Sequence, residues 1–336
     1  MKAFRSLTLS VLLILVLIST GCAPVTETPV TGTPTETLVA ETPTTPPATE
    51  TSAAAIVIAG PATPSSIPLI LAAEKMGNAS VQIIQNNSQA NTLFLRGEIA
   101  ILASGLSVGV DLRKNEAPVQ VLNTYVTGLS YLVTYGKKVE SLSDLKGEEI
   151  YLPFEGSPIE EATMFLAQKE GLVWGTDLKP VYSPFDASVA LLKEGKAKAV
   201  VLPEPFVTLV EKDPNLFISL DYYTSWNAAA GTQAGYPQVG TFVNAEWAKQ
   251  HPAELAAFNA ALAEAIQLIE THPEEAVAKV KDQFKLPEAV LLRSLQRTHF
   301  SLLTGEALKK DVSAYYELIG KPLDDQYTDF YYLPAQ

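Results

Sequence analysis

LLKEGKAKAVVLPEPFVT, residues 191–208, is the stretch that decides the fold. It contains the end of a helix, the helix-stopping Gly195, an apolar run at 199–202, and a Pro-Glu-Pro-Phe loop that opens the next helix. A short, wholly apolar strand between two helices is typical of a parallel sheet that is buried on both faces. Because such sheets bind ligands at the carboxyl ends of their strands, the loop at 203–206 is a candidate binding loop.

The same pattern occurs earlier in the chain, as LFLRGEIAILASGL at residues 93–106. Here a helix ends at Gly97, the strand is 99–102, and the loop is 103–105. Two copies of one α/β unit predict two similar lobes whose binding edges face each other.

The N-terminus reads as an export leader. Two basic residues precede an apolar run at 7–18 that is too short to span a membrane comfortably. The run ends in Ser-Thr-Gly-Cys, which resembles the lipobox of bacterial lipoproteins, although Ser19 stands where leucine is more usual. We therefore expect a signal peptide at 1–22 and lipidation of Cys22. The alternative is an uncleaved anchor helix with an incidental cysteine.

The composition changes abruptly after the leader. Residues 23–52 are rich in Thr, Pro and Glu and contain no Lys, Arg or aromatic residue, which predicts a disordered tether. We expect the rest of the chain to form two lobes, one from 53–127 plus 240–336 and the other from 128–239.

Composition and charge narrow the possible functions. The chain is 47% hydrophobic and 18% charged, which supports a substantial core, and its net charge of −13 with no basic cluster argues against nucleic-acid binding. Its single cysteine allows neither an intrachain disulfide nor a multi-cysteine zinc site. None of the three histidines, His251, His272 and His299, shares a motif with Asp or Glu at metal or triad spacing, so each is expected to be a surface or capping residue. We expect no catalytic residue, no metal and no cofactor.

Strands and helices alternate through both predicted lobes, which indicates an α/β fold with parallel sheets. The expected strands are 56–59, 81–84, 99–102, 119–125, 131–135, 149–152, 179–182, 199–202 and 239–243, and the chain is mostly helical after 245. The clearest helix start is Ser157, followed by a proline and, three residues on, by Glu160, which forms a capping box. The free N–H groups of that helix can hold an anion or a carbonyl oxygen.

Candidate binding residues follow the expected strands. They are Thr63, Ser65, Ser104, Tyr125, Phe154, Ser157, Tyr182, Glu204 and Phe206. The aromatic rings can sandwich a flat ligand, or they can serve core and hinge packing. Glu204 can accept a hydrogen bond from an amine or ring N–H, or it can be a solvated residue in the first turn of a helix. Because these loops carry no Arg or Lys, a neutral or weakly basic heterocycle such as a pyrimidine or flavin fits better than a sulfonate or nitrate.

Three longer phrases resemble solute-binding proteins of ABC importers, in the nitrate/sulfonate/taurine and thiamine-precursor binding family. They are SLSDLKGEEIY at 141–151, the opening stretch 191–208, and EWAKQHPAELAAF at 246–258. The resemblance implies a periplasmic-binding-protein fold of type II, a Venus flytrap of two α/β lobes joined by two crossing strands. It also implies a small-molecule ligand held between the lobes and delivered to a permease and its ATPase.

On this interpretation the protein is a monomeric, extracytoplasmic binding protein, anchored to the cell membrane through the lipid on Cys22, and not an enzyme. The lobes are expected to close about 126–131 and 238–241. The alternatives are a surface lipoprotein that senses its ligand and, less in keeping with the sequence, an enzyme on the same fold. Eukaryotic relatives that make the thiamine pyrimidine carry a cysteine-rich motif, which this chain lacks.

Overall fold

The computed structural model describes residues 56–334. The predicted leader, the lipidation site Cys22 and the predicted tether lie outside the described residues. None of the helices within 56–334 is both long enough and apolar enough to cross a membrane. The described residues belong to one compact unit.

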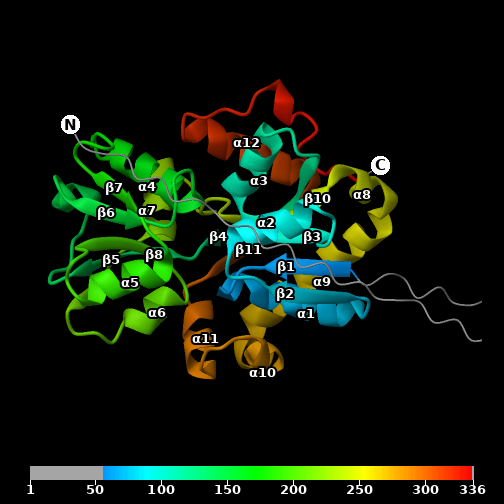
Figure 1. The fold of residues 1–336 in the computed structure, drawn as a ribbon, viewed down its shortest axis with the longest axis horizontal. Helices are drawn as coiled ribbons and strands as arrows, with labels where there is room; N and C mark the ends of the chain where they lie inside the picture. Colours follow the sequence, from blue (N-terminus) through cyan, green and yellow to red (C-terminus); the bar gives the residue numbers. More distant parts are fainter. Residues whose placement is uncertain (1–55, 335–336) are drawn as a thin grey trace, which may run out of the picture. The chain divides into compact units, whose positions relative to one another are not determined.

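Six of the described strands form the first sheet, in the order β11-β4-β10-β3-β1-β2 (Figure 1). Their bounds are β1 Ile56–Gly60, β2 Ala79–Ile83, β3 Ile101–Gly105, β4 Val119–Gly128, β10 Val239–Asn244 and β11 His299–Thr304. β1 pairs in parallel with β2 and β3, whereas β10 runs antiparallel to β3 and β4, and β11 runs antiparallel to β4. The expectation of a wholly parallel sheet is therefore wrong for the first sheet, because β10 and β11, which return to it after the second sheet, run antiparallel to their neighbours.

The second sheet has five strands in the order β7-β6-β8-β5-β9. Their bounds are β5 Ser130–Tyr135, β6 Glu149–Leu152, β7 Lys179–Tyr182, β8 Ala199–Pro203 and β9 Leu216–Asp221. The strand predicted from the opening stretch is β8, which lies in the middle of this sheet and is buried at all five positions. β5 is antiparallel to both of its neighbours, so this sheet is also mixed.

Two connections join the sheets. β4 of the first sheet continues into β5 of the second through Leu129, and the chain returns through Gln238 into β10. The side chain of Gln238 ties these crossings together: its Oε1 accepts the Leu129 N–H at 3.2 Å and its Nε2 donates to Ser130 Oγ at 2.7 Å. In β10, Gly240 is required because a Cβ there would lie 2.5 Å from the Asn123 carbonyl of β4.

We use "first lobe" for the first sheet with its helices. One face carries α1 Ile67–Met76, α9 Pro252–Thr271, α10 Pro273–Val280 and α11 Glu288–Leu295, and the other carries α2 Asn87–Leu95, α3 Leu106–Lys114 and α12 Gly305–Leu318. α8, Ala245–Gln250, follows β10, and the turn η1, Pro64–Ser66, precedes α1. α9 packs through one apolar stripe, since Leu255, Phe258, Leu262, Ile266 and Ile269 are all buried.

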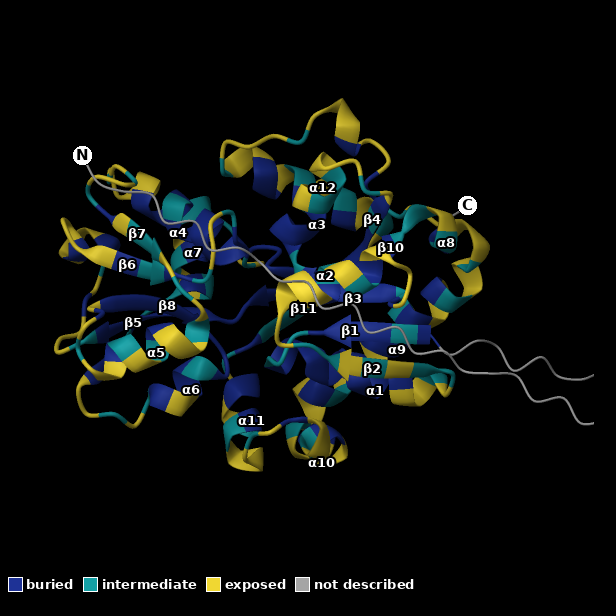
Figure 2. Cartoon of the chain, in the orientation of Figure 1, coloured by how far each residue is buried: buried dark blue, intermediate teal, exposed yellow. Residues whose placement is uncertain are grey.

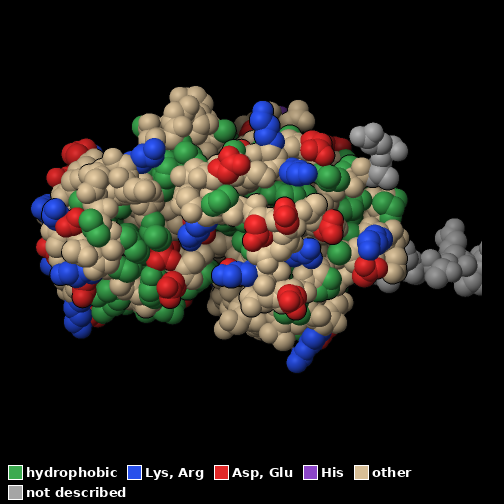
Figure 3. All heavy atoms as spheres, turned by 90° about the horizontal axis from the view of Figure 1, so that it is seen from above, with side chains coloured by type: hydrophobic (Ala, Val, Ile, Leu, Met, Phe, Trp, Pro, Cys, Tyr) green, Lys and Arg blue, Asp and Glu red, His purple; other side chains and the backbone are tan. Residues whose placement is uncertain are grey.

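The "second lobe" is the second sheet with four helices. α4 Pro158–Lys169 and α7 Tyr222–Ala230 cover one face, and α5 Phe185–Lys193 and α6 Phe206–Val210 cover the other. The apolar cluster under α4 and α7 continues into the cluster under α3 and α12, so the two lobes share buried surface. Figure 2 shows the central strands of the sheets, such as β1 and β8, as buried, whereas the edge strands and the helices are partly exposed. On the face in Figure 3, acidic and basic side chains are interspersed without a large patch of one sign.

One local prediction was wrong. The loop expected at 103–105 is the end of β3, because its Ser104 and Gly105 pair with β10. The chain after 245 is mostly helical, as predicted, and it also contributes the strand β11. β11 is an edge strand whose residues are only partly buried, so it lacks the apolar run that marked β8.

Candidate functional site

Two helices, one from each lobe, begin against each other. Gly105 at the end of β3 is the N-cap of α3, and Pro158 is the first residue of α4. A Cβ on Gly105 would lie 2.8 Å from Cγ of Pro158, so the two helix starts are in close contact. The first N–H groups of a helix lack intrahelical partners and carry the positive end of its dipole. The junction therefore gathers two positive helix ends in one place.

The predicted cap of α4 is present. Ser157 Oγ accepts the Glu160 N–H at 3.1 Å. The other half of the predicted capping box is not formed, because the Glu160 carboxylate accepts from Gly156 N–H at 2.5 Å. The same carboxylate accepts the Tyr182 hydroxyl at 2.5 Å, so Tyr182 and Ser157 meet at this helix start.

The start of α3 lacks a side-chain cap. Its first N–H, from Leu106, donates to the Gln238 carbonyl at 3.1 Å, which joins the helix to the returning crossing. Ser107 in the first turn and Thr124 in β4 are both buried, and neither hydroxyl has a hydrogen-bond partner among the described residues. Thr124 and Ser104 pair with opposite sides of Gly240. A buried hydroxyl without a partner costs about 1–3 kcal/mol, so these groups suit a site that binds a polar molecule.

Three predicted residues meet on the other face of the first sheet. Thr63 Oγ1 and Ser65 Oγ are 2.7 Å apart, and Ser65 lies beside the fully buried Tyr125. Burial raises the pKa of the Tyr125 hydroxyl, and the neighbouring Ser65 hydroxyl opposes that shift. Tyr125 belongs to the apolar cluster packed under α1 and α9, and Thr63 and Ser65 lie at the turn η1 that precedes α1.

Glu204 is fully buried and already paired within the protein. One carboxylate oxygen accepts the Thr208 N–H at 3.1 Å, and the other accepts from Thr208 Oγ1 at 3.0 Å and from Nη1 of Arg297 at 3.3 Å. Burial raises the pKa of the Glu204 carboxyl, while Thr208 and Arg297 oppose the shift. Its alternative as a solvated glutamate is wrong, and its role toward a ligand stays a prediction.

Of the two remaining predicted residues, Phe154 lies at the junction, where its carbonyl accepts the Ser157 N–H at 3.3 Å, whereas Phe206 lies elsewhere in the second lobe. Phe206 packs against Phe185 with ring centroids 5.2 Å apart, on the α5 and α6 side of the second sheet. Phe154 follows β6 and is 37% exposed. Their role as ligand contacts also stays a prediction.

Sequence reasoning missed Arg297. The candidate binding loops lie at the ends of strands, whereas Arg297 follows the helix α11. It contacts Glu204 although the two residues are 93 positions apart in the chain. No local pattern connects the two residues.

An aromatic cluster crosses the lobe boundary near α4. Trp226 of α7 lies 5.1 Å from Tyr236 and 5.4 Å from Tyr315 of α12, measured between ring centroids. Tyr315 donates its hydroxyl to Glu161 of α4 at 3.1 Å, and the Lys321 ammonium donates to the same carboxylate at 3.2 Å. The aromatic rings and this ion pair therefore connect the two lobes on the side of α4.

The histidines do not form a catalytic group. His251 and His272 occupy the N-cap positions of α9 and α10. The prediction of a surface or capping role is wrong for His299. It lies in β11 and stacks on Tyr223 of the second lobe, with the two ring centroids 3.7 Å apart. Within residues 56–334, no cluster of three or more His, Cys, Asp or Glu side chains is arranged to hold a metal ion.

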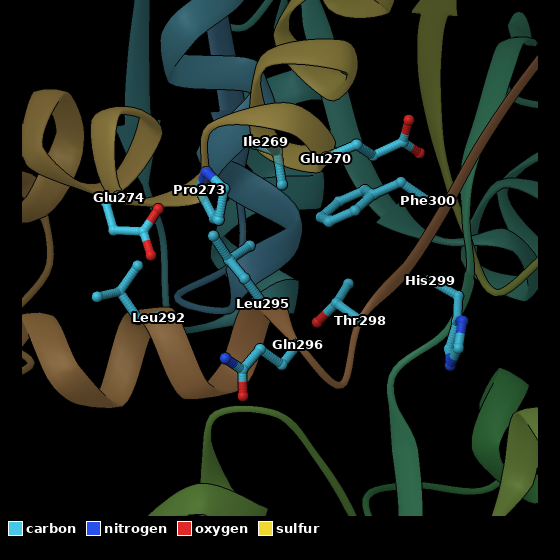
Figure 4. Close-up of a pocket in the computed structure, with 10 residues that line it drawn as sticks. All are labelled: Ile269, Glu270, Pro273, Glu274, Leu292, Leu295, Gln296, Thr298, His299 and Phe300. Atoms are coloured by element: carbon cyan, nitrogen blue, oxygen red, sulfur yellow. The ribbon is translucent and has the colours of Figure 1, made fainter.

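Two cavities lie within the first lobe. One, of about 380 Å³, lies between α9, α10, α11 and β11, where Ile269, Leu292 and Leu295 converge beside Thr298 (Figure 4). The other, of about 520 Å³, lies between α1 and α9. Neither cavity is lined by a predicted binding residue. We therefore base the site on the α3–α4 junction, where polar groups and both lobes meet.

Comparison with known proteins gives a family and a fold. A family model described as NMT1/THI5 like matches residues 63–276. No curated protein matches the chain. Among solved structures, the periplasmic aliphatic sulphonate binding protein SsuA of Escherichia coli is 16% identical, with a TM-score of 0.67 over 84% of this chain and 93% of that one.

Two further structures show the same fold. The alkanesulfonate-binding protein SsuA of Xanthomonas axonopodis, solved with MOPS, is 16% identical with a TM-score of 0.64, over 81% of this chain and 95% of that one. A conserved Candida albicans gene product described as having the generic periplasmic binding protein fold is 14% identical with a TM-score of 0.59, over 83% and 96%. The predicted fold class is thereby confirmed.

Proposed function

The chain belongs to the NMT1/THI5-like family, and we propose that it is the solute-binding protein of an ABC importer. It captures a small solute between the two lobes and delivers it to a membrane permease driven by an ATPase. In this proposal the protein works outside the cytoplasm, held to the membrane through Cys22, and performs no catalysis.

The meeting of α3 and α4 is the observation that carries the proposal. A solute at this junction touches both lobes, so its binding favours the closed arrangement through contacts that the open one lacks. The helix starts supply N–H donors, and the buried hydroxyls of Ser107 and Thr124 supply further hydrogen bonds. Ser104 lies at the end of β3, just before α3, and Ser157 is the N-cap of α4.

The chemistry around the junction favours a flat solute that carries hydrogen-bond acceptors. Positive helix ends and hydroxyl groups suit ring nitrogens and carbonyl oxygens, and the rings of Trp226, Tyr236 and Tyr315 form a buried aromatic cluster on the side of α4. A pyrimidine or a flavin has both features. A sulfonate is the second candidate, because two of the similar structures are sulfonate-binding proteins and helix starts also bind anions.

A thermal-shift screen of the full chain against pyrimidines, flavins, alkanesulfonates and nitrate tests the proposal. A solute at 100 times its dissociation constant should stabilise the protein by about 2.7 kcal/mol. The hit is then titrated by calorimetry into Ser107→Ala and Thr124→Val variants, with Ser80→Ala as the control, because Ser80 is exposed on the edge strand β2. Weaker binding in the first two variants alone supports the site. No hit in any class, or equal affinity in all variants, contradicts it.

A further inference from the structure

The segment from Arg293 to His299 joins the first lobe to the second beside the crossing strands, because His299 pairs with Gly128 at the end of β4. α11 lies beside α6 of the second lobe (Figure 1). Arg297, just after α11, donates from Nη1 to Thr208 Oγ1 at 3.2 Å and from Nη2 to Glu211 Oε2 at 2.6 Å. It also donates to Glu204, and its backbone carbonyl accepts the Tyr131 hydroxyl at 3.0 Å. All of these partners belong to the second lobe.

Burial makes this contact different from an ordinary surface ion pair. The side chain of Arg297 is 14% exposed, and that of Glu204 is fully buried. Removal of one partner from a buried pair leaves the other charge desolvated and uncompensated, which is strongly unfavourable. If α6 separates from α11, the Glu204 carboxylate can regain water, so the unfavourable state is confined to the closed arrangement.

We propose that Arg297 is a positioning residue that sets the balance between closed and open lobes without touching the solute. This inference rests on the proposed function, because only a protein that opens and closes needs such a residue. A rotation about the crossing strands that separates α6 from α11 breaks the contacts of Arg297 with Thr208 of α6 and with Glu211 directly after it. Arg297 therefore stabilises the closed arrangement, and the solute adds to a preference that the protein already has.

The test measures the distance between the lobes with no solute present. Spin labels are placed on Glu98→Cys in the first lobe and Val173→Cys in the second, both exposed, in a full chain carrying Cys22→Ser. Pulsed electron–electron double resonance then gives the distribution of distances between the two spin labels. Arg297→Gln should move the population to longer distances, with the ratio of closed to open molecules falling roughly tenfold.

Two comparisons separate this role from a general structural one. Arg113→Gln removes an arginine whose Nε donates to the Gln326 carbonyl within the first lobe at 2.9 Å, and should leave the distances unchanged. Adding Glu204→Gln to Arg297→Gln removes the uncompensated buried charge, while Glu211 keeps Arg293 as its partner at 3.3 Å, so this double replacement should restore much of the short-distance population. A loss of packing alone would show no such rescue.

An unchanged distance distribution in folded Arg297→Gln overturns the proposal, and so does failure of the double replacement to restore closure. If Arg297→Gln does not fold, Arg297→Lys decides, because lysine keeps the charge but cannot reach both carboxylates. Its distribution must then shift partway, and a wild-type distribution refutes the role. A failed solute screen affects none of these readings, so the two proposals fail separately.

Discussion

Gly105→Ala is expected to keep the lobes from closing fully while each lobe remains folded. Gly105 has φ −57° and ψ 141°, which alanine adopts without strain, so the backbone does not require glycine. The added Cβ would lie 2.8 Å from Cγ and 3.0 Å from Cδ of Pro158 in the opposite lobe. An ordinary carbon–carbon contact is about 3.5–4.0 Å, so the helix starts must separate by roughly 1 Å.

The magnitude follows from the rigidity of the partner. A proline ring at the start of a helix cannot turn aside, so the overlap resembles overpacking of a core, which costs about 1–3 kcal/mol. The cost falls on the closed arrangement alone. Since 1.4 kcal/mol corresponds to a factor of ten, solute affinity should fall by about 5- to 150-fold.

Gly109→Ala is the matched control, because it lies one turn further along α3. A Cβ on Gly109 would overlap the ring of Phe242, which belongs to the same lobe. Gly109→Ala should therefore lower the urea midpoint of unfolding more than Gly105→Ala does, with a smaller effect on the distance between spin-labelled lobes. If Gly105→Ala leaves both affinity and lobe distance as in the wild type, the junction is not a point of closure.

Three further predictions concern stability. Phe258→Ala empties a fully buried position in α9 and should lower the free energy of unfolding by about 3–5 kcal/mol in urea titration, whereas Leu95→Ala at a 55% exposed site should change it by less than about 0.5 kcal/mol. Gln238→Ala leaves its two buried partners, Leu129 N–H and Ser130 Oγ, unpaired in the other crossing, and calorimetric melting should show a loss of about 1–3 kcal/mol; no loss would contradict the role of this side chain as a tie. Burial lowers the pKa of His299 below its usual 6.5, so the unfolded chain takes up a proton first as the pH falls, and stability should drop below about pH 6.5 with a slope of at most about 1.4 kcal/mol per pH unit. In melting curves, the stability of His299→Gln should depend less steeply on pH than that of the wild type, whereas the exposed His272→Gln should behave as the wild type. Equal slopes in the wild type and both variants would be inconsistent with a role for His299.

Local patterns were enough for the elements that lie wholly within one α/β unit. The bounds of β6 and β7 match the predicted 149–152 and 179–182, and β8 extends the predicted strand by one residue. Ser157 caps α4 as expected. Each of these features depends on residues a few positions apart, where apolar periodicity and capping chemistry act directly.

Long-range pairing could not be predicted in the same way. The antiparallel direction of β10 and β11 depends on where the chain returns after the second lobe, which no short window of sequence encodes. The sequence predicts a loop at Gly105, yet this residue pairs with β10, which lies far along the chain. The contact of Arg297 with Glu204 could not be predicted either, since the two side chains meet only after both lobes have folded.

The placement of charge at the lobe boundary bears on how the solute acts. One flank holds Arg297 with two carboxylates, and the other holds Glu161 with Lys321, whose side chain is 48% exposed. In this second pair water screens the Lys321 end, although its partner Glu161 is 5% exposed. The enclosed pair gains most only when the lobes meet, so it strengthens closure without adding much to the stability of either lobe alone. A solute at the α3–α4 junction then has to supply only the remaining preference, and its release to a permease requires a partner that separates α6 from α11.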